Sequence, residues 1–142
     1  MLAYLWVAIG GALGSVSRFW LSGVVAERWG ETFPWGTLFV NVTGSAVIGF
    51  LAAILSPDSA WLGTISLGRL KMGPGDLRIL FMTGVCGGYT TFSSFSLQTL
   101  NLLRDREWLY AGANVILSVV LCMAAVWLGY LAGAAFNTMK GN

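Results

Sequence analysis

Histidine is absent from this chain of 142 residues, and only six acidic residues occur in it. The two cysteines, Cys86 and Cys122, lie 36 positions apart, a spacing that fits neither a zinc site nor a thioredoxin-type pair. With no histidine, and with no Asp or Glu inside an apolar segment, the many serines have no base to activate them as nucleophiles. The sequence therefore predicts that the protein is not an enzyme, and we interpret both cysteines as small packing residues.

Charge of either sign is scarce as well. Charged residues make up 10% of the chain, hydrophobic residues make up 56%, and the mean hydropathy is +0.74. A typical soluble domain carries about 25% charged residues, so this composition excludes an ordinary water-soluble protein. The net charge of +2 is too small to indicate a nucleic-acid partner. These values predict a membrane protein.

Proline occurs at only three positions, which leaves four long apolar runs free to form helices that cross a bilayer. We predict a single transmembrane domain over residues 1–142, with helices at about 2–26, 33–55, 77–103 and 108–136 and a glycine-rich loop over 56–76. The first run has no basic region ahead of it and no convincing cleavage site. We therefore expect it to be a retained helix, not a signal peptide.

The centre of the third predicted helix differs from its apolar flanks. Between Gly84 and Gln98 the chain carries three glycines and five serine or threonine residues. In hydrocarbon, the carbonyl groups freed by a helix break persist only where protein, water or an ion satisfies them. A glycine-rich interruption in the middle of a membrane helix therefore predicts an ion site or a conduction path.

Polar side chains recur at helical spacing in three of the predicted helices. They are Thr37, Asn41 and Ser45 in the second, Thr91, Ser94, Gln98 and Asn101 in the third, and Tyr110, Asn114, Ser118 and Cys122 in the fourth. Together these stripes predict a narrow path lined by neutral hydrogen-bond donors, which replace part of an anion's hydration shell without a countercharge. The alternative for any one of them is a bond to its own helix or to a neighbouring helix.

Phe92 and Phe95 share a face beside this polar stripe. Such a pair usually serves packing, but an aromatic edge carries the positive end of the ring quadrupole and can face a small anion. Both interpretations remain open from spacing alone.

Lysine and arginine are almost evenly divided between the two sides of a four-helix topology. Arg69, Lys71, Arg78 and Lys140 lie on one side, and Arg28, Arg104 and Arg106 lie on the other. This division does not select an orientation. A chain that inserts both ways is able to form an antiparallel homodimer; the alternative is a single orientation fixed by a small bias.

Arg18 is the only charge within the first predicted helix, about eight residues or roughly 12 Å from its end. It either reaches the membrane interface, lines a vestibule that attracts anions, or holds the fold.

Three segments resemble the Fluc, or CrcB, family of fluoride channels. They are Gly10-Gly11-Ala12-Leu13-Gly14 with Arg18-Phe19, Gly36-Thr37-Leu38-Phe39-Val40-Asn41-Val42-Thr43-Gly44, and Gly87-Gly88-Tyr89-Thr90-Thr91-Phe92-Ser93-Ser94-Phe95-Ser96. The third segment is the most specific, and the fourth helix matches best between Asn114 and Ser118.

The resemblance implies an all-α membrane protein with four transmembrane helices, the third broken near its centre. It further implies a dual-topology antiparallel homodimer in the bacterial inner membrane, with two pores that export fluoride passively and lower cytoplasmic fluoride. A structural sodium ion is held, on this resemblance, by the backbone carbonyls of Gly87 and Thr90. The implied pore residues are Phe92, Phe95, Asn41 and Ser118, with Arg18 in the first helix.

Two positions depart from the family pattern. Gln98 stands where a glutamate is frequent, and Asn114 stands where a tyrosine is frequent, so the polar track formed by Thr91, Ser94, Gln98 and Asn114 differs in detail. The 56–76 loop is also longer than we expect for the family. The alternatives are a small proton-coupled multidrug transporter, which needs an intramembrane carboxylate that this chain lacks, and a structural membrane subunit.

Overall fold

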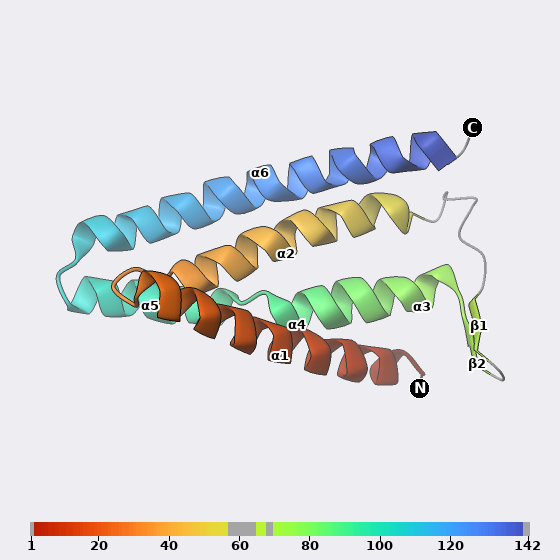
Figure 1. Cartoon of the computed structure of the whole chain (residues 1–142), viewed down its shortest axis with the longest axis horizontal. Coiled ribbons are helices and arrows are strands. Elements are labelled where there is room, and N and C mark those ends of the chain that lie inside the picture. The colour runs from red at the N-terminus through yellow and green to blue at the C-terminus, as the bar shows by residue number, and fades with distance from the viewer. Residues whose placement is uncertain (1, 57–64, 68–69, 141–142) are drawn as a thin grey trace.

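The computed structural model describes residues 2–56, 65–67 and 70–140, and these are almost entirely helical (Figure 1). The elements are α1 (Leu2–Trp29), α2 (Trp35–Ile54), β1 (Ile65–Leu67), β2 (Leu70–Met72), α3 (Pro74–Arg78), the π-helical η1 (Ile79–Cys86), α4 (Gly87–Tyr89), α5 (Phe92–Arg104) and α6 (Trp108–Lys140). Of these, α1, α2 and α6 are long and apolar enough to cross a membrane. The prediction of a helical membrane protein is confirmed.

The segment predicted as a loop is more ordered than its composition suggested. Within 56–76, strands β1 and β2 form an antiparallel hairpin in which Ile65 pairs with Met72. Helix α3 starts at Pro74, three residues before the predicted 77, because proline suits the first helical turn and Asp76 Oδ2 accepts from the Gly73 N–H at 3.0 Å. Residues 57–64 and 68–69 of the predicted loop lie outside the described residues.

Helices α1 and α6 continue beyond their predicted ends. The apolar runs indicated 26 and 136, whereas the helices end at Trp29 and Lys140. Hydropathy marks where the hydrocarbon ends, but a helix continues past that point as long as its residues keep good helix propensity.

Glycines bring the helix backbones close together within the chain. A Cβ on Gly84 would lie 2.9 Å from the Gly10 Cα, and a Cβ on Gly129 would collide with the Ala46 carbonyl. The contacts join α1 to η1 and α4, and α2 to α6, and α2 and α6 lie side by side in Figure 1. These glycines therefore serve close helix packing inside one chain.

The carboxyl end of α2 is fixed by side chains from two other elements. Arg78 donates from Nη1 to the Leu55 carbonyl at 3.1 Å, and Asn137 donates from Nδ2 to the Ala53 carbonyl at 2.8 Å. The last carbonyls of a helix have no intrahelical donor. These two bonds satisfy such groups and tie α3 and α6 to α2.

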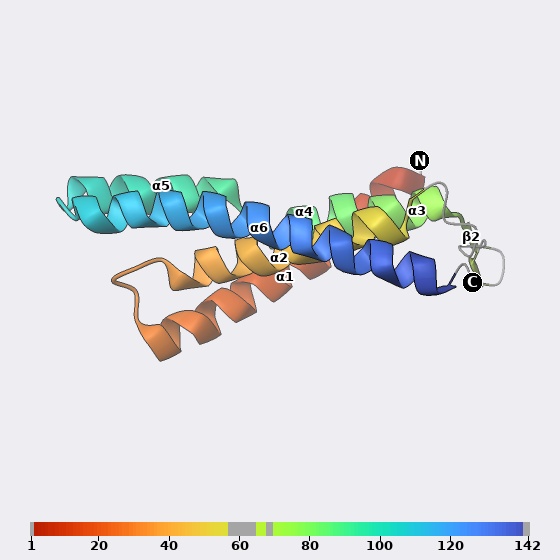
Figure 2. The ribbon, with the colours of Figure 1, turned by 90° about the horizontal axis from the view of Figure 1, so that it is seen from above.

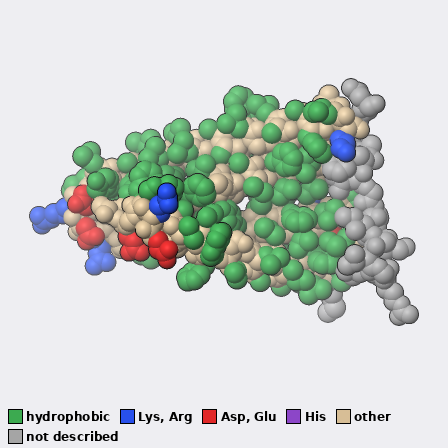
Figure 3. All heavy atoms as spheres, viewed as in Figure 1, with side chains coloured by type: hydrophobic (Ala, Val, Ile, Leu, Met, Phe, Trp, Pro, Cys, Tyr) green, Lys and Arg blue, Asp and Glu red, His purple; other side chains and the backbone are tan. Residues whose placement is uncertain are grey.

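At the opposite end of the molecule, α5 lies beside α6 and away from α1 (Figure 2). The surface is largely hydrophobic, and most charged side chains visible in Figure 3 gather at this end, where α5 turns into α6. The space between α1 and α5 is the larger of the two cavities described below.

Candidate ion pathway

The helical path is interrupted between α4 and α5, where the sequence places two threonines in a row. Thr90 has φ −81° and ψ 157°, and Thr91 has φ −151° and ψ 115°, so both are extended. β-Branched residues favour this conformation. Thr91 also begins the next helix, because its Oγ1 accepts from the Ser94 N–H at 3.2 Å as an N-cap.

One amide side chain holds the interruption in place. Asn41 of α2 donates from Nδ2 to the Thr91 carbonyl at 3.0 Å, and its Oδ1 accepts from the Thr91 N–H at 2.8 Å. The side chain thus pairs with both backbone groups of Thr91, as a neighbouring β-strand would. Because an unpaired buried peptide group is costly, these bonds stabilise the extended backbone and fix it to α2.

The interruption leaves several carbonyl oxygens without their helical donors, and those of Gly87 and Thr90 are two of them. In a continuous helix, Gly87 would accept from the N–H of Thr91, but that N–H donates to Asn41. Thr90 would accept from the N–H of Ser94, but that N–H donates to the Thr91 hydroxyl. The carbonyl groups of Gly87 and Thr90 therefore lose their regular helical donors.

A cavity of about 400 Å³ lies beside the interruption. Its lining includes Asn41, Gly87, Thr90, Thr91, Phe92, Phe95, Ser118 and Cys122. The ring centroids of Phe92 and Phe95 are 5.2 Å apart, and Phe92 is 78% exposed in the single chain. The cavity has no acidic or basic side chain in its lining.

Two neutral donors remain available at this smaller cavity. The Ser118 hydroxyl is buried and has no hydrogen-bond partner among the described residues. Asn41 Nδ2 carries two hydrogens, and the bond to Thr91 uses one of them. An unpartnered hydroxyl and an amide hydrogen thus belong to residues that line this cavity, together with the aromatic rings.

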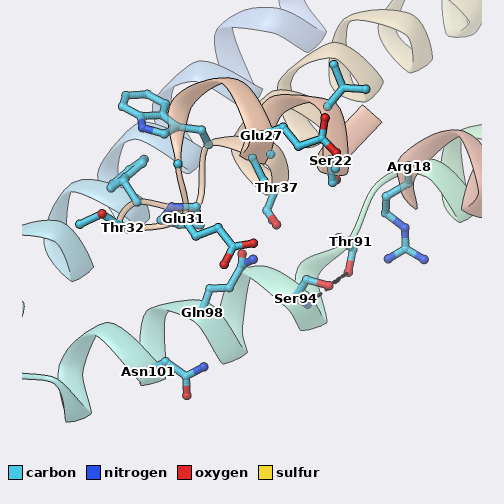
Figure 4. Close-up of a pocket in the computed structure, with 18 of the residues that line it drawn as sticks. Arg18, Ser22, Glu27, Glu31, Thr32, Thr37, Thr91, Ser94, Gln98 and Asn101 are labelled. Atoms are coloured by element: carbon cyan, nitrogen blue, oxygen red, sulfur yellow. Dashed lines mark hydrogen bonds between the residues drawn. The ribbon is translucent and has the colours of Figure 1, made fainter. Parts of the chain in front are cut away.

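A larger cavity, of about 1290 Å³, lies on the other side of Thr91, between α1, the start of α2 and α5 (Figure 4). Its polar lining includes Arg18, Ser22, Thr37, Thr91, Ser94, Gln98 and Asn101, with Glu27, Glu31, Asp105 and Glu107. Thr91 lines both cavities. In Figure 4, Thr91 and Ser94 lie between Arg18 and Asn101.

The structure brings together most of the residues predicted for the pathway, in two groups. Asn41, Phe92, Phe95 and Ser118 line the smaller cavity, Ser94, Gln98 and Arg18 line the larger one, and Thr91 lines both. Asn114 lines neither. It is fully buried, and its Nδ2 donates to Thr99 Oγ1 at 2.8 Å. The polar stripe of α6 is therefore divided, with Ser118 and Cys122 at the cavity and Asn114 against α5.

Several residues near the interruption were not singled out from the sequence. The hydroxyls of Thr43 and Tyr89 lie 2.8 Å apart and connect α2 to α4, and Thr99 accepts from Asn114. Thr43 and Tyr89 lie within the segments that carried the family resemblance, whereas Thr99 lies outside them and had no signal beyond its place on a polar helix.

Known proteins are similar to this chain over nearly all of its length. Residues 5–130 match the family described as CrcB-like protein, Camphor Resistance (CrcB). A protein of Opitutus terrae named fluoride-specific ion channel FluC is 57% identical over all of both chains. A protein of the same name from Rhodospirillum rubrum is 54% identical over 96% of this chain, and one from Methylocella silvestris is 51% identical over 97% of it. Each match spans 98% of the relative's own length. The resemblance drawn from the three sequence segments is confirmed, and this chain, a multi-pass membrane protein, belongs to the CrcB family.

Proposed function

We propose that this protein is a fluoride-selective channel that lets fluoride leave the bacterial cytoplasm passively and so lowers its concentration there. The observation that carries the proposal is the smaller cavity, which joins neutral donors to two phenyl rings and has no fixed charge. The names of the similar proteins support the same ion.

Fluoride is small and strongly hydrated, so a site that passes it must replace water without binding it too tightly. The Ser118 hydroxyl and the second N–H of Asn41 supply hydrogen bonds. The edges of Phe92 and Phe95 supply the positive end of a ring quadrupole. None of these groups carries a full charge, which in a low-dielectric cavity would trap or repel an anion strongly. The anion then moves between the two cavities past Thr91.

The larger cavity serves in this proposal as the water-filled approach. Arg18 and the polar side chains of Thr37, Ser94 and Gln98 line it, and they favour a partly hydrated anion. Four carboxylates share the same lining. They come from the end of α1, the loop after it and the α5–α6 turn, and at physiological ionic strength water and ions screen such charges over about 8 Å.

The assembly that we propose is an antiparallel, dual-topology homodimer. Segments α3, η1, α4 and α5 form the third of four crossings, broken at Thr90 and Thr91. The near-even division of lysine and arginine supports insertion in both orientations. The 78% exposure of Phe92 supports a second chain that covers the smaller cavity, because a pathway for a hydrated ion must be enclosed from lipid.

A structural sodium ion fits the carbonyl oxygens of Gly87 and Thr90. Both oxygens lose their helical donors at the interruption, and both residues line the smaller cavity. A hard cation prefers neutral or charged oxygen ligands, and two copies of the segment at a dimer axis double the number available. When bound, the ion supplies positive charge near an anion path; the chain's own residues hold the extended backbone that presents the oxygens.

The first prediction concerns transport by the unmodified chain. Reconstituted into liposomes loaded with potassium fluoride or potassium chloride, the protein should release fluoride rapidly and chloride very slowly, at a rate independent of a proton gradient. Ion-selective electrodes measure both. Proton-coupled exchange of cationic drugs would instead identify a multidrug transporter, and the absence of any flux would favour a structural subunit.

The second prediction concerns the aromatic rings. Replacing Phe92 or Phe95 with isoleucine keeps the apolar volume similar but removes the ring edge, so fluoride efflux should fall at least about tenfold while the protein stays folded and oligomeric by gel filtration. Phe81→Ile is the matched control, because Phe81 is 41% exposed and lines neither cavity. Normal efflux in both ring variants would remove the rings from the mechanism.

The third prediction concerns Asn41. In Asn41→Asp the carboxylate accepts from the Thr91 N–H but, when ionised, has no hydrogen for the Thr91 carbonyl, and it adds a negative charge to the smaller cavity. Fluoride efflux should fall at least about tenfold. Asn101→Asp adds the same charge at an exposed site in the larger cavity and should cost far less. Equal losses in the two variants would contradict the role given to Asn41.

The fourth prediction concerns sodium. An ion that binds only the folded dimer raises stability, by about 2.7 kcal/mol at 100 times its dissociation constant. The thermal unfolding midpoint of the purified protein should therefore be higher in sodium chloride than in choline chloride at equal ionic strength. Identical midpoints across a wide concentration range would argue against a sodium site.

A further inference from the structure

A second amide holds α5 farther along the chain from the interruption. Asn114 of α6 is fully buried, and its Nδ2 donates to Thr99 Oγ1 at 2.8 Å. Thr99 Oγ1 in turn donates to the Phe95 carbonyl at 2.8 Å, one helical turn earlier. A short chain of hydrogen bonds thus runs from α6, through Thr99, to the backbone of a residue whose ring lines the smaller cavity.

The hydrogen bonds fix which way the Asn114 amide points. A threonine hydroxyl has one hydrogen, and that hydrogen goes to the Phe95 carbonyl, so Thr99 Oγ1 can only accept from Asn114. The Nδ2 group therefore faces Thr99, and Oδ1 faces away from it, with no partner among the described residues. Reversing the amide would require Thr99 to give up its bond to Phe95. The Oδ1 atom can only accept hydrogen bonds, and Asn114 lines neither cavity.

The position of the Thr99–Asn114 pair allows it to control the orientation of α5. This helix contacts α6 and only a small part of α2, and residues on another side of it line the larger cavity. Asn41 bonds to Thr91 and so fixes the residue that immediately precedes the first turn of α5. Thr99 lies eight residues later, about 12 Å along the axis at the regular rise. Two attachment points at that separation set both the direction and the rotation of the helix.

We propose that Thr99 and Asn114 form a positioning pair that sets the rotation of α5 and so places the rings of Phe92 and Phe95 at the smaller cavity. Asn114 acts through α5 and does not contact the permeating ion. This inference rests on the proposed function for its transport consequence, but the placement of the rings is a structural statement that holds without it.

The test is a double-mutant cycle with Thr99→Val, Asn114→Leu and the double variant, measured by fluoride efflux from liposomes. Each single change leaves one buried polar group without its partner, so efflux should fall about tenfold, the factor that corresponds to about 1.4 kcal/mol. The double variant removes both groups, and its efflux should be no lower than that of the worse single variant. Thr99→Ser keeps the hydroxyl and should conduct like the unmodified chain.

Thr138→Val is the matched control, because Thr138 also donates to the carbonyl four residues earlier but is exposed. It should conduct normally. A second readout is the ¹⁹F resonance of 4-fluorophenylalanine placed at position 95, which should shift in Thr99→Val and in the double variant but not in Thr138→Val. This readout reports ring placement even if the single variants fold poorly, because the double variant leaves no unpaired polar group at the pair.

The outcomes separate the inference from the proposed function. Failure of the unmodified chain to pass fluoride would overturn the function, whereas the ¹⁹F shifts would still decide the positioning role. A loss of efflux in Asn114→Leu with normal efflux and an unshifted resonance in Thr99→Val would overturn the positioning pair and place Asn114 on the ion path. Losses that add in the double variant would also overturn it.

Discussion

The pairing of Asn41 with both backbone groups of Thr91 is the interaction on which the rest of the site depends. It substitutes for helical hydrogen bonds that the extended stretch cannot make, and so it satisfies both backbone groups of a buried residue. Its consequence reaches in two directions. On the amino-terminal side, the Gly87 carbonyl loses its helical donor. On the carboxyl-terminal side, α5 begins after the extended residues, and Phe92 and Phe95 line the smaller cavity.

A glycine on α2 leaves room for the side chains of Tyr89 and Thr90 beside this pairing. A Cβ on Gly44 would lie 3.0 Å from the Tyr89 ring and would collide with the Thr90 methyl group. Gly44 is three residues after Asn41, on the same face of α2. The absent side chain therefore makes room for the interruption where the amide can reach it. The hydroxyl contact between Thr43 and Tyr89, at 2.8 Å, then holds α4 in the same place.

The sequence predicts the structure best where a single physical rule applies. Apolar length predicted α1, α2 and α6, because a helix that crosses lipid must satisfy its own backbone. The β1–β2 hairpin was missed, because glycine and proline indicate a change of direction but not whether the flanking residues pair. Helical spacing placed Asn114 and Ser118 on one stripe, yet they have different surroundings. Periodicity predicts which residues share a face of a helix, but it does not predict which neighbouring element each of them contacts. The bond between Asn114 and Thr99 could therefore not be predicted from the sequence.

Charged side chains are distributed unevenly between the two cavities. All full charges that line a cavity lie in the larger one, where Arg18 is accompanied by four carboxylates, and the smaller cavity has only neutral groups. In a wide, hydrated space such charges are screened and act mainly on the rate at which ions arrive. Once a second chain covers the smaller cavity, as we propose, a single charge there would act far more strongly, because less water would screen it. In the proposed channel, neutral dipoles held in fixed directions distinguish a small anion from a larger one, and the two amide attachments of α5 keep those directions.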